Sequence, residues 1–214
     1  MFRDENLLIV FSKAPVPGQV KTRLIPALGA EGAAALHLSL LAHTVKALHQ
    51  KKHWNTELWV SSTHSAFDNI VDKNELRSFK QEGNDLGQKM HHAFQCSFTR
   101  FKHVVIVGTD CPFLESVDIK QAFSQLAEND DLVLGPASDG GYVLIGLNRP
   151  RKSLFENISW GTSDVLRQTL EKANSQNLFY TLLPEKNDID RPEDLQQLTD
   201  WPDLNLEDYA LASE

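Results

Sequence analysis

The sequence predicts an α/β protein with three layers, in which a mainly parallel central sheet is covered by helices on both faces. Short apolar runs such as Leu7–Phe11 alternate along the chain with longer segments of helical periodicity. Val104–Val107 is continuously apolar and mostly β-branched, which is typical of a strand buried on both faces. Leu132–Leu134 and Tyr142–Leu147 lie so close in sequence that they predict a local antiparallel excursion.

The other elements follow from hydrophobic spacing. A long helix is expected over about 31–50 and further strands at Thr56–Ser61 and Leu178–Leu183, whereas His64–Lys80 is ambiguous. Ser116 and either Thr162 or Ser163 are expected to cap helices, and 190–193 has the form of a capping box. The residues expected to face the core from four helices are Leu38, Leu41, Val45 and Leu48, then Leu86, Met90, Phe94 and Phe98, then Ile119, Phe123 and Leu126, then Val165, Leu166 and Leu170.

Composition limits the class of protein. The chain has 214 residues, 41% of them hydrophobic, which suits one domain with a proper core. Its net charge of −8 argues against general nucleic-acid binding. The acidic start lacks the form of a signal peptide, no apolar run approaches a membrane span, and the two cysteines form no C-x-x-C motif. We therefore expect a cytoplasmic protein that binds neither nucleic acid nor membrane.

The loop after the first strand is a candidate phosphate site. It contains Lys13, Lys21 and Arg23, and Gly18 lets its backbone approach a ligand; Ser12 stands at its start. Arg binds phosphate oxygens bidentately, and Lys acts as a point charge. The loop lacks the glycine spacing of a P-loop. The alternative is a solvated basic loop, but its position after the first strand favours a ligand site.

Four aspartates are candidate metal ligands. Asp110 lies just past the end of the strand Val104–Val107, where ligands bind in open α/β sheets. Asp188 and Asp190 lie in a later D-I-D segment, and Asp139 lies in S-D-G-G. Mg²⁺ is usually bound by one or two carboxylates together with substrate phosphates. Turn roles remain open for Asp110 and Asp139, and a capping role remains open for Asp190.

Six motifs in order carry a family resemblance: F-S-K-A-P-V-P-G-Q-V-K-T-R-L, Q-E-G-N-D-L-G-Q-K-M, V-G-T-D-C-P-F-L, G-P-A-S-D-G-G-Y-V-L-I-G-L, I-S-W-G-T-S and N-D-I-D-R-P-E-D-L. Over about residues 6–199 the chain resembles a bacterial family of GT-A-like transferases in the nucleotide-diphospho-sugar transferase superfamily. More distantly, K-T-R-L is similar to phospholactate guanylyltransferases, and D-C-P-F-L is similar to molybdenum-cofactor guanylyl- and cytidylyltransferases.

The resemblance implies a three-layer, Rossmann-like GT-A fold over 1–199, with a nucleotide-binding half at about 1–110 and an acceptor half at about 111–199, followed by an acidic tail at 200–214. It implies that Asp110 binds metal and that the D-I-D segment supplies a later ligand. Two departures stand out. Gly108 turns the usual D-x-D into G-T-D, and a G-G-x-G-x-R loop is absent.

We therefore expect an Mg²⁺-dependent (or Mn²⁺-dependent) transferase that moves a nucleotidyl group from a nucleoside triphosphate to a small phosphorylated acceptor. Lys21 and Arg23 would hold the triphosphate, and Asp139 would act as a base or contact the acceptor. A glycosyltransferase using a nucleotide sugar is the alternative, and a non-catalytic nucleotide-binding protein is a third reading. The sequence leaves the oligomeric state open.

Overall fold

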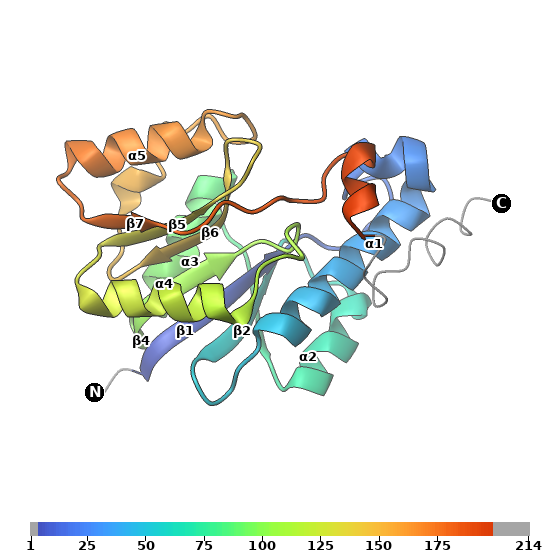
Figure 1. Ribbon diagram of the computed structural model, residues 1–214. Helices are drawn as coiled ribbons and strands as arrows, with labels where there is room; N and C mark the ends of the chain where they lie inside the picture. Colours follow the sequence, from blue (N-terminus) through green and yellow to red (C-terminus); the bar gives the residue numbers. More distant parts are fainter. Residues whose placement is uncertain (1–3, 199–214) are drawn as a thin grey trace.

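One seven-stranded sheet forms the centre of the molecule. A computed structural model describes residues 4–198 (Figure 1). The strand order is β3-β2-β1-β4-β6-β5-β7, and β6 runs antiparallel to both of its neighbours while the other pairs are parallel. The predicted antiparallel excursion is thereby confirmed. The strands are β1 (Asp4–Ser12), β2 (Asn55–Val60), β3 (Arg77–Lys80), β4 (Phe101–Val107), β5 (Leu132–Pro136), β6 (Tyr142–Leu147) and β7 (Tyr180–Leu182).

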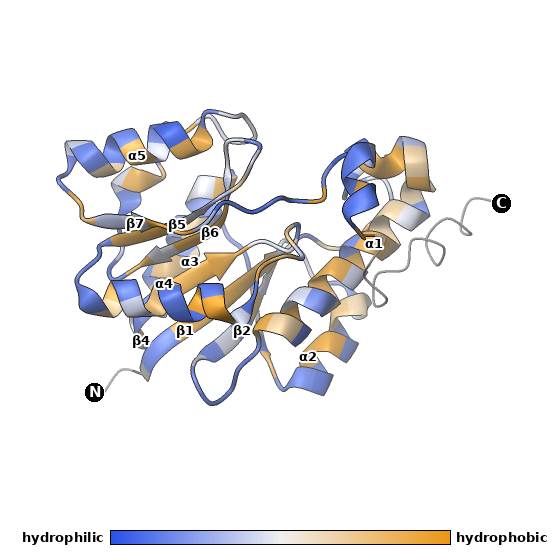
Figure 2. Ribbon diagram, viewed as in Figure 1, coloured by the Kyte–Doolittle hydropathy of each residue, from blue (hydrophilic) through white to orange (hydrophobic). Residues whose placement is uncertain are grey.

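Helices cover both faces of this sheet, as predicted. Alternate residues of β1 supply the two cores: Leu8 and Val10 face a cluster with α1, α2 and α4, whereas Leu7 and Ile9 face one with α3 and α5. The central strands are correspondingly hydrophobic (Figure 2). The helices are α1 (Ile25–Leu48), α2 (Asp68–Asn74), α3 (Leu86–Ser97), α4 (Ser116–Glu128) and α5 (Val165–Ser175), and short 3-10 turns lie at Thr22–Leu24 (η1), Ser65–Phe67 (η2), Lys152–Leu154 (η3) and Pro192–Leu198 (η4).

Helix α1 is buried on two sides. Leu41, Val45 and Leu48 pack on the sheet as predicted, whereas Leu38 is only partly buried. The opposite side of its first half packs against η4, which lies beside it in Figure 1. The helix begins at Ile25, six residues before the expected start, and kinks where the backbone at position 29 is non-helical.

Burial on two sides explains why α1 is so apolar. The helical span 22–48 is long and apolar enough to cross a membrane by length and composition, so the expectation that no such stretch exists is wrong. Half of its most apolar window is buried inside the fold, as in the core helix of a globular protein. The cytoplasmic location stays a prediction.

Several local expectations are corrected by the structure. Leu86 is 46% exposed because the buried face of α3 runs through Met90 and Phe94 and leaves its first residue on the flank. Glu115, and not Ser116, caps α4 through a capping box. Asp164 precedes α5 in place of Thr162 or Ser163, although the Thr162 hydroxyl accepts a bond from the Asp164 N–H.

Two more segments are now assigned. The ambiguous stretch 64–80 forms η2, α2 and the edge strand β3. At 190–193 the expected capping box is wrong, because the carboxylate that accepts the Asp190 and Arg191 N–H bonds belongs to Asp194. The predicted tail 200–214 lies outside the described residues. The boundary between the two predicted halves stays a prediction, and a single sheet runs through both.

Candidate active site

The carboxyl ends of β1, β4 and β5 meet at one edge of the sheet. The segment Lys186–Asp190 crosses this edge, bridging in parallel to Ala137 just after β5. Further along, the Ile189 N–H donates to the carbonyl of Asp110 at 2.7 Å. This crossing brings the D-I-D segment to the ends of the strands, so the predicted basic loop and the four predicted acids share one region of the molecule.

Lys21 and Asp110 form an ion pair at this edge. The Lys21 ammonium lies 2.6 Å from Asp110 Oδ1, and it also donates to the Ile189 carbonyl. The Lys21 side chain is 2% exposed, whereas that of Asp110 is 51% exposed. Crowding by protein atoms acts to raise the pKa of Asp110, but the charge and hydrogen bond of Lys21 outweigh it and hold the pKa below its usual value.

A second ion pair joins the same two segments. The Arg23 guanidinium donates to Asp190 Oδ2, and both side chains keep contact with solvent. Two cations of the predicted phosphate loop therefore contact two acids of the predicted metal site. Each cation already pairs with an acid of this edge, and its phosphate-binding role stays a prediction.

Asp188 lies in the centre of the acidic group and has no ion pair within residues 4–198. Partial burial raises its pKa to about 6, and the negative charges of Asp139, Asp190 and Asp110 add to the rise. Three neighbouring carboxylates thus act on one group. This local excess of negative charge is what a bound cation would neutralise.

Asp139 is held by its turn. Its carboxylate accepts the Gly141 N–H at 2.8 Å, which matches the turn role left open by the sequence. Gly140 has φ +89°, and a Cβ there would collide with the Ser163 carbonyl. The Gly140 carbonyl also accepts the Leu166 N–H at 2.9 Å. The S-D-G-G turn is therefore fixed against the start of α5, and Asp139 with it.

Two functional candidates escaped the sequence reasoning. His37 on α1 is buried, and its Nε2 lies 3.2 Å from Ser12 Oγ and 3.0 Å from the Lys13 carbonyl. Burial lowers its pKa, despite the hydrogen bond to Lys13 and the charge of Asp110. Gln81 donates to the carbonyls of Ser12 and Trp59, at the ends of β1 and β2. The signal for His37 was its spacing of four residues from Leu41 in the apolar stripe.

The basic loop lies after β1, as predicted, and its side chains differ in their exposure to solvent. Ser12 is 3% exposed, whereas Lys13 is exposed. Gly18 has φ +79° in the turn that returns the chain to Lys21, and a side chain there would meet nothing within 4 Å. The backbone of this turn is therefore open to a ligand. Cys111 is buried and its pKa is raised to about 11 by that burial, in agreement with a structural role.

The acidic group suits a metal that binds together with a ligand. Among the described residues, no three Asp, Glu, His or Cys side chains gather closely enough to enclose an ion by themselves. Carboxylate oxygens are the donors that Mg²⁺ prefers, and Mg²⁺ normally takes only one or two of them in addition to phosphates and water. Partial burial and the charges of the neighbouring carboxylates raise the pKa of Asp188, and a cation bound beside it would oppose this rise.

The fold and this edge of the sheet define a protein of the nucleotide-diphospho-sugar transferase-like superfamily, as the six motifs indicated. The particular family follows from the sequence. The model of the family described as "Uncharacterized protein conserved in bacteria (DUF2064)" matches residues 44–162, and the chain belongs to this family. A search of curated proteins found no match.

Solved structures agree with this assignment. A protein from Desulfovibrio desulfuricans G20, provisionally described as a nucleotide-diphospho-sugar transferase, is 29% identical with a TM-score of 0.83, covering 98% of this chain and 94% of its own. A cytidylyltransferase from Leptospira borgpetersenii has 16% identity and a TM-score of 0.57, with 92% and 85% covered. The inositol-1-phosphate CTP transferase of T. maritima has 14% identity and a TM-score of 0.56, with 99% and 96% covered. The last two likenesses concern the fold alone.

Proposed function

We propose that this protein is a Mg²⁺-dependent nucleotidyltransferase that uses a nucleoside triphosphate and a small phosphorylated acceptor. The observation that carries the proposal is the juxtaposition, at one sheet edge, of Lys21 and Arg23 with an acidic group that includes Asp110 and Asp188. A triphosphate is negatively charged and its metal ion is positively charged. The two cations at this edge can bind the triphosphate, and the carboxylates can bind the metal ion. The cytidylyltransferase and the CTP transferase among the structural neighbours, both of which use cytidine nucleotides, add support.

Asp110 and Asp188 are the proposed metal ligands. Asp188 is preferred over Asp190 because Asp190 is already paired with Arg23, whereas Asp188 feels the repulsion of its neighbours. A metal ion held there would neutralise charge on the phosphates. Asp139 lies within electrostatic range of Asp188 and is proposed to contact the acceptor or take its proton.

The chain's own groups supply positioning and charge stabilisation. In the proposed reaction an acceptor phosphate oxygen attacks the α-phosphorus, and the bond from that phosphorus to the bridging oxygen breaks. The electron pair leaves with pyrophosphate. Arg23, which is half exposed, is placed to swing from Asp190 to the leaving phosphates. His37 holds Ser12 and the Lys13 carbonyl and so fixes the loop that carries these cations.

Glycosyl transfer from a nucleotide sugar is the second candidate. It is favoured by one observation, the description of the 29%-identical Desulfovibrio protein. The same acids and cations would then stabilise a departing nucleoside diphosphate. The two reactions differ in the donor, so the donor is the quantity to test.

The test is ligand-dependent thermal stability of the full chain. Nucleoside triphosphates and nucleotide sugars are each added with Mg²⁺ and again with EDTA. A ligand at 100 times its dissociation constant stabilises by about 2.7 kcal/mol, or about 5–10 °C for a chain of this size. A Mg²⁺-dependent preference for triphosphates is expected; a preference for nucleotide sugars selects the second candidate. Failure of every nucleotide to give a Mg²⁺-dependent shift would reject both.

Asp110→Asn supplies the matched variant. It keeps an oxygen for Lys21 but removes the charge, so it should abolish the Mg²⁺-dependent part of the shift and lower turnover at least about 10²-fold. Asp72→Asn makes the same change at an exposed position of α2 and should behave as the unaltered protein. If both variants respond alike, Asp110 has no part in the site.

A further inference from the structure

The segment that carries Asp188 crosses the sheet edge as irregular chain. Residues 183–191 lie between β7 and η4, and the bridge from Lys186 to Ala137 pairs this stretch with the sheet. Irregular chain lacks the repeating bonds of a helix or strand, and the carboxylates around Asp188 repel it. The contacts on either side of Asp188 therefore decide where its carboxylate lies.

The contacts after Asp188 involve a proposed metal ligand. The Ile189 N–H donates to the Asp110 carbonyl at 2.7 Å, and the Ile189 carbonyl accepts a bond from Lys21. The ammonium of Lys21 also lies 2.6 Å from Asp110 Oδ1. A metal ion that binds the Asp110 carboxylate competes with this ammonium, so these contacts are themselves altered when the proposed site fills.

The contacts before Asp188 come from Lys186. Its Nζ lies 3.0 Å from Asp118 Oδ2 and donates to the Phe113 carbonyl at 3.2 Å. The side chains of Lys186 and Asp118 are 21% and 8% exposed. Asp118 Oδ2 also accepts the Glu115 N–H at 2.9 Å, which fixes this carboxylate to the start of α4. Neither partner of the Lys186 ammonium belongs to the acidic group, so a metal ion bound there does not compete for them.

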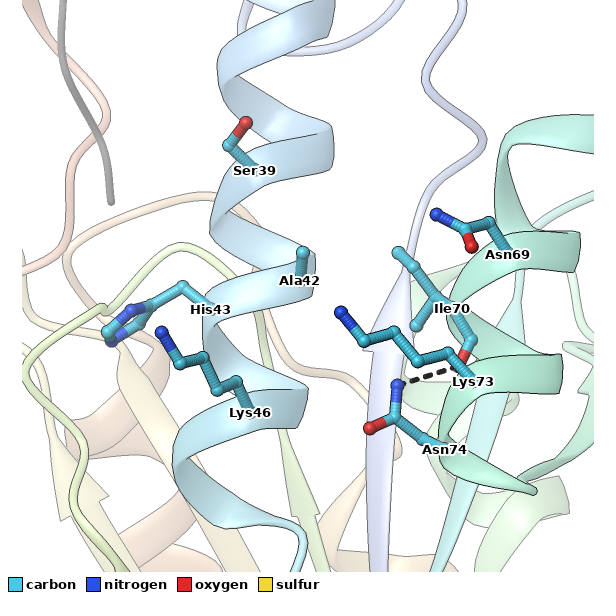
Figure 3. A pocket seen from close by; sticks show the side chains of 8 residues that line it. All are labelled: Ser39, Ala42, His43, Lys46, Asn69, Ile70, Lys73 and Asn74. Atoms are coloured by element: carbon cyan, nitrogen blue, oxygen red, sulfur yellow. Dashed lines mark hydrogen bonds between the residues drawn. The ribbon is translucent and has the colours of Figure 1, made fainter. Parts of the chain in front are cut away.

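The turn that follows Asp110 is held by two side chains from other segments. Lys186 donates to the carbonyl of Phe113, and His43 Nε2 lies 3.2 Å from the carbonyl of Pro112. His43 belongs to α1, and Figure 3 shows its ring on the side of that helix away from α2. The turn is thereby fixed both to α1 and to the segment that carries the D-I-D acids.

The backbone of Lys186 holds the turn that carries Asp139. The Lys186 N–H donates to the Pro136 carbonyl at 3.0 Å, and the Lys186 carbonyl accepts the Ser138 N–H at 3.2 Å. A single residue, two positions before Asp188, is therefore bonded to the segments that carry two of the other acids. Replacing its side chain leaves the backbone bonds possible and removes only the contacts of the ammonium.

We propose that Lys186 is a positioning residue that sets the separation between Asp110 and Asp188. The inference rests on the proposed function, in which these two carboxylates bind one Mg²⁺ ion. Mg²⁺ demands a near-ideal octahedral arrangement of its ligands, so carboxylates from two segments share one ion only when the segments are held in place. Residues that orient metal ligands without touching the metal typically change metal affinity about 10–100-fold when they are removed.

The first test compares triphosphate binding to the full chain with Mg²⁺ and with EDTA, by calorimetric titration. The probe is whichever of ATP, CTP, GTP and UTP binds the unaltered protein most tightly. The Kd in EDTA divided by the Kd with Mg²⁺ measures how much the metal tightens binding. Lys186→Met, which keeps a long side chain without its charge, should lower this ratio about tenfold or more. The Kd in EDTA should stay nearly unchanged, whereas a role in attracting the anion would weaken binding in EDTA as well.

A second readout needs neither metal nor nucleotide. The Ile189 N–H donates to the Asp110 carbonyl, so its hydrogen exchange in EDTA reports whether the segment stays on the turn. Lys186→Met should speed exchange at Ile189 more than it speeds exchange of the amides in β4. Equal effects at both places would show a general loss of stability and would contradict a local anchoring role.

Three further variants control for folding and charge. Lys186→Met leaves Asp118 buried without its cation, so the double variant Lys186→Met/Asp118→Asn removes both charges and should show the same lowered ratio. Lys186→Arg keeps the charge and the donors and should restore most of the ratio. Lys102→Met makes the same change at the opposite end of β4, where Lys102 pairs with Glu5, and should behave as the unaltered protein.

Failure of this inference is distinguishable from failure of the proposed function. If the unaltered protein binds no triphosphate more tightly with Mg²⁺ than with EDTA, the proposed function fails and the role of Lys186 falls with it. If the unaltered protein shows the tightening and both the single and the double variant keep it, only the role of Lys186 is overturned. Faster exchange at Ile189 with an unchanged ratio also overturns it, because Lys186 then holds the segment without serving the metal.

Discussion

Replacing Asp188 by Asn should stabilise the metal-free protein at neutral pH. Asp188 is partly buried and lies among the charges of Asp139, Asp190 and Asp110, and its pKa is raised to about 6. Folding therefore costs free energy whenever this carboxyl is ionised. Asparagine retains an oxygen to accept the backbone bond that Asp188 makes, but it carries no charge.

The size and the pH window follow from the pKa. A rise from the usual 3.8 to about 6 corresponds to a ceiling of about 3 kcal/mol. Because the side chain is partly exposed, solvent screening reduces this to about 1–2 kcal/mol. Between these two pKa values the folded protein binds more protons than the unfolded chain, so stability falls as the pH rises. The penalty is absent below about pH 4 and complete above about pH 7.

Urea denaturation in EDTA at pH 4, 5, 6 and 8 measures this difference. The advantage of Asp188→Asn over the unaltered protein should grow by about 1–2 kcal/mol from pH 4 to pH 8, or about 2–8 °C in Tm. Asp72→Asn, at an exposed position, should show no such growth. An advantage of Asp188→Asn that is independent of pH would refute the electrostatic account, because only an ionising group produces this slope.

Two further substitutions test the scaffold. Gly140→Ala should lower the free energy of unfolding by about 2–4 kcal/mol, because the new methyl group collides with the Ser163 carbonyl and the residue has a positive φ. Gly161→Ala is the control: its φ is +80° but the space around it is open, so it should lower the free energy of unfolding by only about 1–2 kcal/mol in the same urea titration. Glu57→Gln should lower it by about 2–4 kcal/mol, since this buried carboxylate accepts two bonds from Arg100; an unchanged urea midpoint would contradict that role.

The fold was predictable because the buried residues of a helix or strand recur at a regular spacing along the sequence. The second half of β4, Val104–Val107, is covered on both faces and is an unbroken apolar run. The stripe through Leu41, Val45 and Leu48 packs into one core. β3 was not predictable, because its four residues form an edge strand with largely exposed side chains. The second buried side of α1 was also missed, because η4 reaches it from 144 or more residues along the chain.

The location of the site was predictable in outline, and its pairing was not. Chain order and the rule for strand ends placed the basic loop and Asp110 on one edge of the sheet. The contact between Lys21 and Asp110 was not predictable, because it depends on the irregular segment 186–190, which crosses the edge and offers the Ile189 carbonyl. Buried partners such as His37 were hidden within an apolar helix pattern.

The pairing changes how the acids and bases of this edge must be understood. Lys21 neutralises Asp110 and Arg23 neutralises Asp190, so neither pair presents a free charge to an approaching ion. A metal alone competes with an ammonium that is 2% exposed, and a polyphosphate alone competes with carboxylates already in contact. A metal–nucleotide complex replaces both partners at once. On the proposed function, Asp188 is the place where this exchange begins, since it has no ion pair in the described structure and the charges of three neighbouring carboxylates raise its pKa.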